Sequence, residues 1–374
     1  PHRAADHAQS GYFRHPRQTA GLRANRLGAV GRRDKRAQAG WQINALRLFS
    51  GCLFPLLRQP EKHFNPPRRQ PERYQTMPPL FDLQFESLES ILATVEDCQS
   101  ALGWLEISFG SFRLNINGQS LFNYHPNCVQ EWLNDPEYCL YLRLSGLQAQ
   151  DVDYSIDSFY LALQDTLPFL SDSVPTLAHE LYLCSREAQW DYCNLWEERE
   201  DALAQQIGVE AARKQSNYGF RYFYENSFTD FGISIPETHT WRYGDDVYIR
   251  FNSMATTENG EPCFAYPQHC VYRLPHHRFI NEYRQFAQCY LDGMKRGIKA
   301  LRPLLPSPAE NPYNNFESLM YWHQHLQNEL EAKLTAIHPQ SWDEVWQANQ
   351  AAGIDLAAMV EKWQKHRLPI IDVQ

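Results

Sequence analysis

The stretch from Trp241 to Ala300 constrains the fold of this chain more than any other. Residues 241–252 read WRYGDDVYIRFN, with β-forming side chains on both sides of a Gly-Asp-Asp turn, which predicts a tight hairpin. Two further short strands are expected at Phe264–Tyr266 and Cys270–Leu274. Pro275 then begins a long helical pattern, whose apolar positions are Phe279, Tyr283, Phe286, Tyr290 and Met294. This stretch predicts an antiparallel meander closed by an amphipathic helix.

The first half of the chain combines strands and helices in the same way. Strands are expected at 79–85, 104–109, 112–116, 121–124, 140–144 and 220–224, with turns at Gly110-Ser111 and at Asn117-Gly118, the strongest two-residue hairpin signal. Helices are expected at 154–170 and, as one long helix, from Pro175 toward Gly208. We therefore predict an α+β fold in which antiparallel β-meanders pack with amphipathic helices.

Charge divides the chain near Met77, its first methionine. Residues 1–76 hold 15 Lys and Arg against 4 Asp and Glu, whereas residues 77–374 hold 20 against 40, a net charge of −20. The first segment is rich in Arg and lacks periodicity, which is typical of a translated upstream region, so we expect Met77 to be the native start. The alternative is a basic tail that binds nucleic acid, since clustered arginines neutralise phosphates.

The composition changes again after Leu305, where PSPAENPYNN is a linker signal. Beyond it, a helical stripe is expected at 316–334, a capping box at Ser341 and Glu344, and a last helix at 356–363. We therefore expect three parts: an irregular basic segment at 1–76, an α+β body at 77–304 and a helical C-terminal extension at 305–374.

The spacing of the cysteines and the hydropathy of the chain indicate the cellular compartment in which the protein is expected. The 9 cysteines include no C-x-x-C pair, which favours reduced, buried thiols over a disulfide scaffold. No stretch approaches the ~18–20 consecutive apolar residues that a bilayer requires. We therefore expect a soluble cytoplasmic protein that makes no membrane contact.

The segment from Cys263 to His277 has the highest density of Cys and His. It holds Cys263, His269, Cys270, His276 and His277. Metal ligands must converge from short paired spacings, whereas these residues alternate along an expected strand or stand side by side at a helix start. We therefore expect no metal and no cofactor. The alternative is an enzyme of unknown reaction that uses this region, with Cys270 as a nucleophile and a His partner.

Several short motifs follow one another in a recognisable order along the chain. They are Asn117-Gly118, Leu121–Tyr124, Val152–Tyr154, Leu167-Pro168, Val174-Pro175, Trp241–Asp245, Asn259-Gly260, Met294 and Arg296. In this order they resemble a bacterial family, domain of unknown function 5984. The resemblance covers roughly Leu80 to Leu301 and leaves out 1–76 and the residues after Leu305. It implies no activity and no catalytic residue.

The negative charge of residues 77–374 favours binding over catalysis. Such a charge repels nucleic acid and attracts basic proteins, and four aspartates, Asp151, Asp153, Asp157 and Asp165, are expected at a helix start and its exposed side. Since no convergent catalytic set is recognisable, we expect a protein-binding module of the immunity type that neutralises a basic toxin domain.

The expected contact surface is the acidic end of the second helix. It consists of Glu197, Glu198, Glu200 and Asp201, with Trp196 as an apolar anchor. Trp346 and Trp363, in the C-terminal extension, are further candidates for an interface because that segment has few apolar residues of its own.

Overall fold

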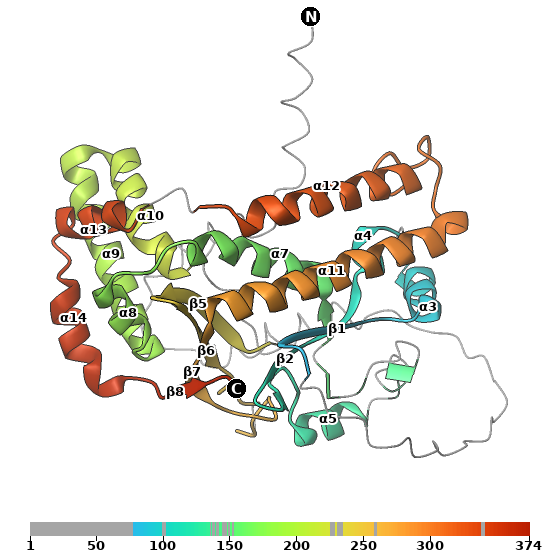
Figure 1. Ribbon diagram of the computed structural model, residues 1–374, viewed down its shortest axis with the longest axis horizontal. Helices are drawn as coiled ribbons and strands as arrows, with labels where there is room; N and C mark the ends of the chain where they lie inside the picture. The colour runs from blue at the N-terminus through green and yellow to red at the C-terminus, as the bar shows by residue number, and fades with distance from the viewer. Residues whose placement is uncertain are drawn as a thin grey trace, which may run out of the picture. The chain divides into compact units, whose positions relative to one another are not determined.

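The computed structural model describes residues 78–98, 102–134, 136, 139, 142–143, 148, 150–151, 153–224, 229, 235–257, 260–337 and 341–374. All of them belong to one unit of the chain, Cys52–Gln374. Its first elements are β1 (Phe81–Phe85), α3 (Leu88–Cys98), α4 (Trp104–Ile107), β2 (Phe109–Ile116), β3 (Gln119–Ser120), α5 (Pro126–Trp132), β4 (Asp153–Ser155) and α7 (Ile156–Thr166). The fold is mixed α+β with mostly antiparallel sheets, as predicted (Figure 1).

The first sheet forms around β2. β1 and β4 pair with it antiparallel, and β3 returns from it through the Asn117-Gly118 turn. Both turn residues have positive φ, 51° and 80°, which suits the twist of a two-residue hairpin and confirms this turn. The last turn of the meander is therefore fixed by local sequence alone.

The hairpin expected at Gly110-Ser111 is wrong. Residues 104–107 form α4, and β2 runs straight through Gly110, which pairs with Phe85 of β1. A Cβ at Gly110 would lie 2.1 Å from the backbone oxygen of Gln84, so the glycine permits a close approach of two strands. Sequence alone does not separate this use of glycine from a turn.

The second half of the chain begins with three helices and continues with a second sheet. The helices are α8 (Thr176–Tyr182), α9 (Arg186–Ile207) and α10 (Val209–Tyr224). The strands β5 (Glu237–Tyr243), β6 (Asp246–Asn252) and β7 (His269–Pro275) form the predicted antiparallel meander, and Gly244, at φ 62°, makes the turn between β5 and β6. β8 (Ile370–Asp372), which was not predicted, adds parallel to β7.

The long helix expected after Pro275 is confirmed as α11 (His276–Leu301), and it organises the larger core. Its buried side includes Phe279, Tyr283, Phe286 and Met294, which pack with β1, β2, α7 and one face of the second sheet. α12 (Phe316–Leu334) runs alongside α11 and contributes Leu319, Leu326 and Leu330 to the same cluster (Figure 1). Aromatic side chains dominate this core, and Phe112 and Phe159 stack at 3.9 Å between ring centroids.

The other face of the second sheet carries a separate core. Trp241, Tyr248 and Val271 point to this side, whereas their chain neighbours Ile249 and Tyr272 point to the α11 side, as the period of two requires. α8, α9, α13 (Trp342–Ala351) and α14 (Leu356–Trp363) cover them. The capping box of Ser341 and Glu344 is present at the start of α13. Residues after 305 therefore contribute to both cores and, through β8, to a sheet.

Further expectations differ from the structure, and one of them is the strand expected at 121–124, where Asn123 and Tyr124 form isolated bridges only. The helix expected at 175–208 is interrupted at Ser185, where the backbone is extended (ψ 169°) and its N–H donates to the oxygen of His366 at 3.1 Å. Residues 220–224 are the helical end of α10, so their aromatic content misled the strand prediction. Residues 264–266 form only an isolated bridge from Phe264 to Tyr124, and the strand expected at 140–144 lies mostly outside the described residues.

Candidate functional site

The acidic helix α9 has one buried face and one exposed face. Ala188, Tyr192 and Trp196 follow one another at a spacing of four and are completely buried in the core that α9 shares with α13 and α14. The expectation that Trp196 anchors a partner is therefore corrected, because its indole is 0% exposed. Trp196 holds the helix in place, and the surface lies on the opposite side.

The acidic residues expected at the surface are placed as follows. Glu197, Glu198 and Asp201 are exposed, whereas Glu200 is half-buried and lies 3.9 Å from the guanidinium of Arg213 on α10. Arg213 is itself well exposed, so this ion pair contributes little to stability. We call Glu197, Glu198 and Asp201, together with Trp190, the α9 acidic face.

Trp190 is the functional candidate that sequence reasoning missed. Its side chain is 45% exposed, and it lies 7 and 11 residues before Glu197 and Asp201 along α9. These separations are close to two and three helical turns, so the three side chains share one stripe. The spacing was visible in the sequence, but only the structure shows which of the tryptophans in α9 faces outward.

Two of the four aspartates expected at a helix start and its exposed side, Asp151 and Asp157, make contacts inside the fold, and the side chain of Asp153 lies outside what the structure describes. Asp151 is 3% exposed and accepts two hydrogen bonds from Arg113, at 3.1 and 2.5 Å, which raise the pKa of that guanidinium. Asp157 accepts hydrogen bonds from the indole of Trp104 at 2.7 Å and the hydroxyl of Tyr290 at 2.6 Å. The carboxylates of Asp151 and Asp157 therefore stabilise contacts within the fold.

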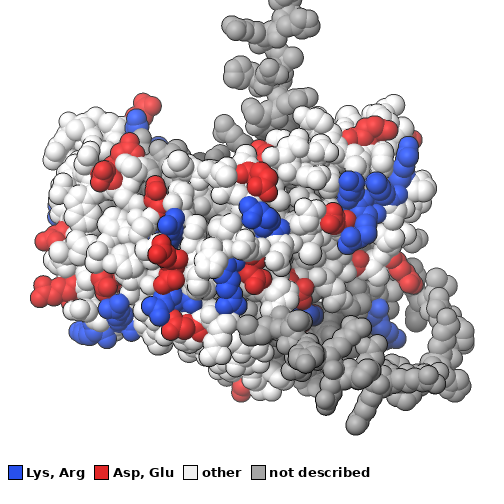
Figure 2. All heavy atoms as spheres, viewed as in Figure 1, with Lys and Arg blue, Asp and Glu red and all other residues white. Residues whose placement is uncertain are grey.

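Charge is interleaved on the surface that Figure 2 shows. Lys and Arg side chains lie among Asp and Glu across that face, so no single sign covers it. Asp165, the exposed member of the aspartate set, faces Lys333 at 3.5 Å. Such pairs mix the two signs on this face, and they leave the net charge of −20 for residues 77–374 unchanged.

The Cys and His residues of 263–277 do not converge. Cys263 and Cys270 are buried in the α11 core, and burial raises the pKa of each thiol to about 11. His276 is half-buried at the start of α11, and burial lowers its pKa, whereas His277 is exposed. Among the described residues, no three His, Cys, Asp or Glu side chains come together as metal ligands.

A buried polar cluster lies at the end of the β5–β6 hairpin, on the side of the sheet that carries Trp241. Glu237 lies 3.1 Å from His239, 3.6 Å from Arg250 and 3.2 Å from the amide of Asn252. Glu237, His239 and Arg250 are each less than 10% exposed, so the cluster joins two strands and is closed to a substrate. Polar residues stand at every second position, Glu237 and His239 in β5 and Arg250 and Asn252 in β6, and this sequence pattern could have predicted the cluster.

The two tryptophans suspected in the C-terminal extension are placed differently. Trp363 donates from its indole nitrogen to Asp191 of α9 at 3.0 Å, so it joins α14 to α9. Trp346 is partly buried on α13 and lines a surface hollow between α13 and α14. Trp363 therefore makes an internal contact, and Trp346 borders open space.

Comparison with known proteins identifies a family whose function is unknown. The model of the family of unknown function DUF5984 matches residues 80–348, and the chain belongs to this family. The match extends past the expected end near Leu301 and includes α12 and most of α13. No curated protein and no solved structure matches this chain. Among the described helices, none has the length and apolar character needed to cross a membrane.

Proposed function

We propose that this protein is a binding protein of the immunity type, which captures a basic toxin domain through the α9 acidic face. The observation that carries the proposal is the exposure of Glu197 and Asp201 in one stripe of α9 with the 45% exposed Trp190, while Glu198 is exposed beside that stripe. Aromatic residues are enriched at the centre of protein interfaces and the rim is polar, so Trp190 fits the centre of such an interface and the carboxylates fit its rim.

Electrostatics supports a basic partner. Carboxylates on an exposed helix attract a positively charged domain over a Debye length of about 8 Å at physiological salt, and they repel nucleic acid. Their main effect is on the association rate, since exposed ion pairs add little affinity once the complex has formed. Rapid capture is the property that neutralisation of a toxin requires.

The protonation and the burial of the Cys263 and Cys270 thiols favour a binding function over covalent catalysis by a cysteine. Thiols with a pKa near 11 are protonated at neutral pH, and Cys263 and Cys270 are 4% and 2% exposed. A nucleophilic cysteine needs the thiolate and access to substrate. We therefore place the function on the α9 acidic face.

The test is co-expression with the adjacent reading frame. We expect the neighbour to be toxic alone and harmless with this protein. Glu197→Lys with Glu198→Lys is expected to lower the association rate about tenfold at low salt. The matched control, Glu89→Lys with Glu317→Lys, makes the same change in charge on exposed positions of α3 and α12. A neighbour that is harmless alone, or that kills equally in the presence of this protein, would remove the proposal.

A further inference from the structure

Two cysteines that are far apart in the sequence lie side by side at α5. Cys128 belongs to α5, and Cys263 belongs to the connection between β6 and β7. The thiol of Cys128 donates to the oxygen of Pro262 at 3.4 Å, and the thiols of Cys128 and Cys263 are hydrogen-bonded to each other. Both are free thiols in this structure. The two sulfur atoms are therefore neighbours that belong to different segments of the fold.

The backbone on either side of the two cysteines accounts for their proximity. Tyr124 and Phe264 form an antiparallel bridge, and the N–H of His125 donates to the oxygen of Cys263 at 2.9 Å. α5 begins with the next residue, so Cys128 lies about one helical turn beyond the residue that is bonded to Cys263. This arrangement turns the side chain of Cys128 back over the paired segment.

The element that covers the pair is a short helix at the surface. α5 has 7 residues, of which Pro126, Asn127 and Gln130 are exposed, and the amide of Asn127 donates to Glu261 at 3.1 Å. Elements that bury few residues open locally at low free energy. Cys128 and Cys263 are each 4% exposed, so a molecule little larger than water reaches them when α5 opens.

The surroundings of the pair favour a disulfide over a metal ion. A zinc site needs further ligands beside two thiolates, and no third His, Cys, Asp or Glu joins them as a ligand in the described part of the chain. The buried Cys270 differs, because its neighbour is the hydroxyl of Tyr272. Two adjacent thiols without further ligands are the arrangement from which a disulfide forms.

We propose that Cys128 and Cys263 form a reversible disulfide when the protein meets a peroxide, and that this bond fastens α5 to the connection between β6 and β7. The thiolate of one cysteine attacks a peroxide oxygen; the O–O bond breaks, an S–O bond forms, and hydroxide leaves with the thiol proton as water. The second thiol then attacks the sulfur of this sulfenic acid, the S–O bond breaks, and a second water leaves. Two thiols and one hydrogen peroxide thus give one disulfide and two waters.

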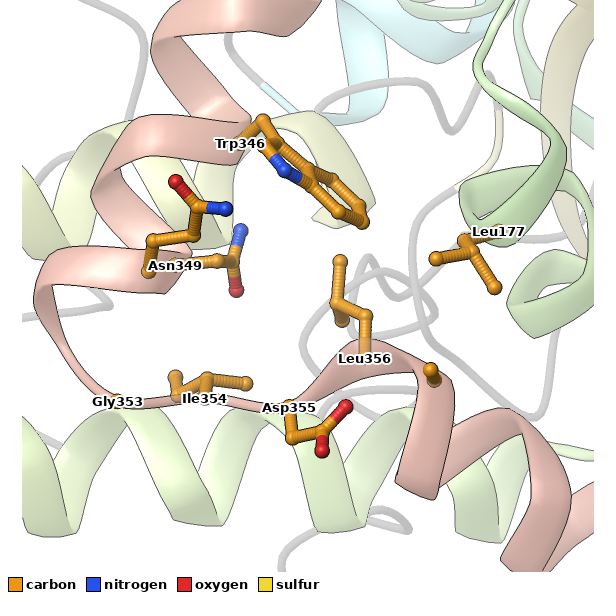
Figure 3. A pocket seen from close by; sticks show the side chains of 9 residues that line it. Leu177, Trp346, Asn349, Gly353, Ile354, Asp355 and Leu356 are labelled. Carbon is orange, nitrogen blue, oxygen red and sulfur yellow. The ribbon is translucent and has the colours of Figure 1, made fainter.

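Burial makes this oxidation slow at neutral pH. Burial, and secondarily the neighbouring thiol of Cys128, raise the pKa of Cys263 to about 11, so the reactive thiolate is scarce. The rate of oxidation should therefore increase as the pH rises from 7 to 9. The site is separate from the α9 acidic face and from the hollow beside Trp346 (Figure 3), since no cysteine lines that hollow.

The experiment oxidises the full chain with hydrogen peroxide, blocks the remaining thiols in denaturant and identifies the cross-linked peptides by mass spectrometry. Chymotrypsin cuts after Trp132 and Phe264, which separates the two cysteines from Cys139 and Cys270. We expect one principal disulfide, between Cys128 and Cys263. Because it closes a long loop, the oxidised protein should melt about 5–10 °C higher than the reduced protein. Dithiothreitol should reverse both changes.

Two alanine variants separate this pair from the other thiols. Cys128→Ala should lose both the cross-link and the rise in melting temperature on oxidation. Cys270→Ala is the matched control and should keep both, because Cys270 is 2% exposed and burial also raises its pKa to about 11. Mapping of the wild type decides the matter if Cys128→Ala does not fold. The proposal is overturned if the oxidised wild type has no disulfide between Cys128 and Cys263, has it no more often than other pairs, or melts no higher than the reduced protein.

Discussion

Acidification should destabilise this protein through His179 of α8. The ring is 5% exposed and stacks on Tyr243 at 3.9 Å between centroids. Its Nδ1 accepts a hydrogen bond from the indole nitrogen of Trp241 at 3.1 Å. Burial, and secondarily the charge of Arg367, lower the pKa of His179 to about 4. Protonation would place a second hydrogen between Nδ1 and the indole N–H and would break this bond.

The size of the effect follows from the two pKa values. In the unfolded chain His179 titrates near its ordinary 6.5, so between 6.5 and about 4 the unfolded state binds more protons than the folded state. Stability from this residue is therefore fully present above about pH 6.5 and is lost as the pH falls toward 4. Between about pH 7 and pH 4.5 the loss amounts to roughly 2 kcal/mol.

Urea unfolding at a series of pH values measures this effect. His179→Asn keeps an acceptor near the position of Nδ1 and does not titrate, so the variant should lose about 2 kcal/mol less than the wild type between pH 7 and pH 4.5. His277→Asn, at an exposed position, is the matched control and should follow the wild type. The reasoning is refuted if the wild type and His179→Asn lose the same free energy of unfolding over this range.

Three further predictions test the core, the α9 acidic face and the first segment. Gly110→Ala should cost about 2–4 kcal/mol, measured by urea unfolding, because its Cβ would lie 2.1 Å from the oxygen of Gln84, and a wild-type stability would disprove this close approach. Trp196→Ala should cost about 3–5 kcal/mol, whereas Trp190→Ala should leave the melting temperature nearly unchanged and weaken partner binding; the reverse pattern would contradict the assignment of the two faces of α9. Deletion of residues 1–76 should leave the melting temperature unchanged, and a loss of several degrees would show that the first segment contributes to the fold.

The elements that were predicted correctly are those specified by residues within or next to the element itself. Gly244 and the Asn117-Gly118 pair supply the positive φ angles that their turns need, and α11 repeats its apolar positions over many turns after Pro275. Gly110 misled the prediction because its role depends on the neighbouring strand β1, far from it in sequence. β8 was missed for the same reason, since three residues carry too little local signal to show a pairing with β7.

The candidate site was predicted in part. The exposed carboxylates of α9 were found from composition, but the tryptophan was chosen wrongly. The expectation treated 175–208 as one helix, whereas the chain breaks at Ser185 and the faces of α9 are therefore not in phase with those of α8. In α9, Trp196 points inward and Trp190 outward. A helical period shows the faces of a continuous helix only, so an unrecognised break removes that information.

The position of β8 has a consequence for proteolysis and self-association. β7 lies between β6 and β8, so the peptide groups on its outer side are occupied by residues 370–372. Cleavage just before Leu368 would release this strand and leave β7 as an open edge next to Val271 and Tyr272, both apolar and now buried. Open apolar edges pair with edges of other chains. The trimmed protein should therefore form concentration-dependent oligomers, which a size-exclusion profile would reveal as earlier elution at higher loading.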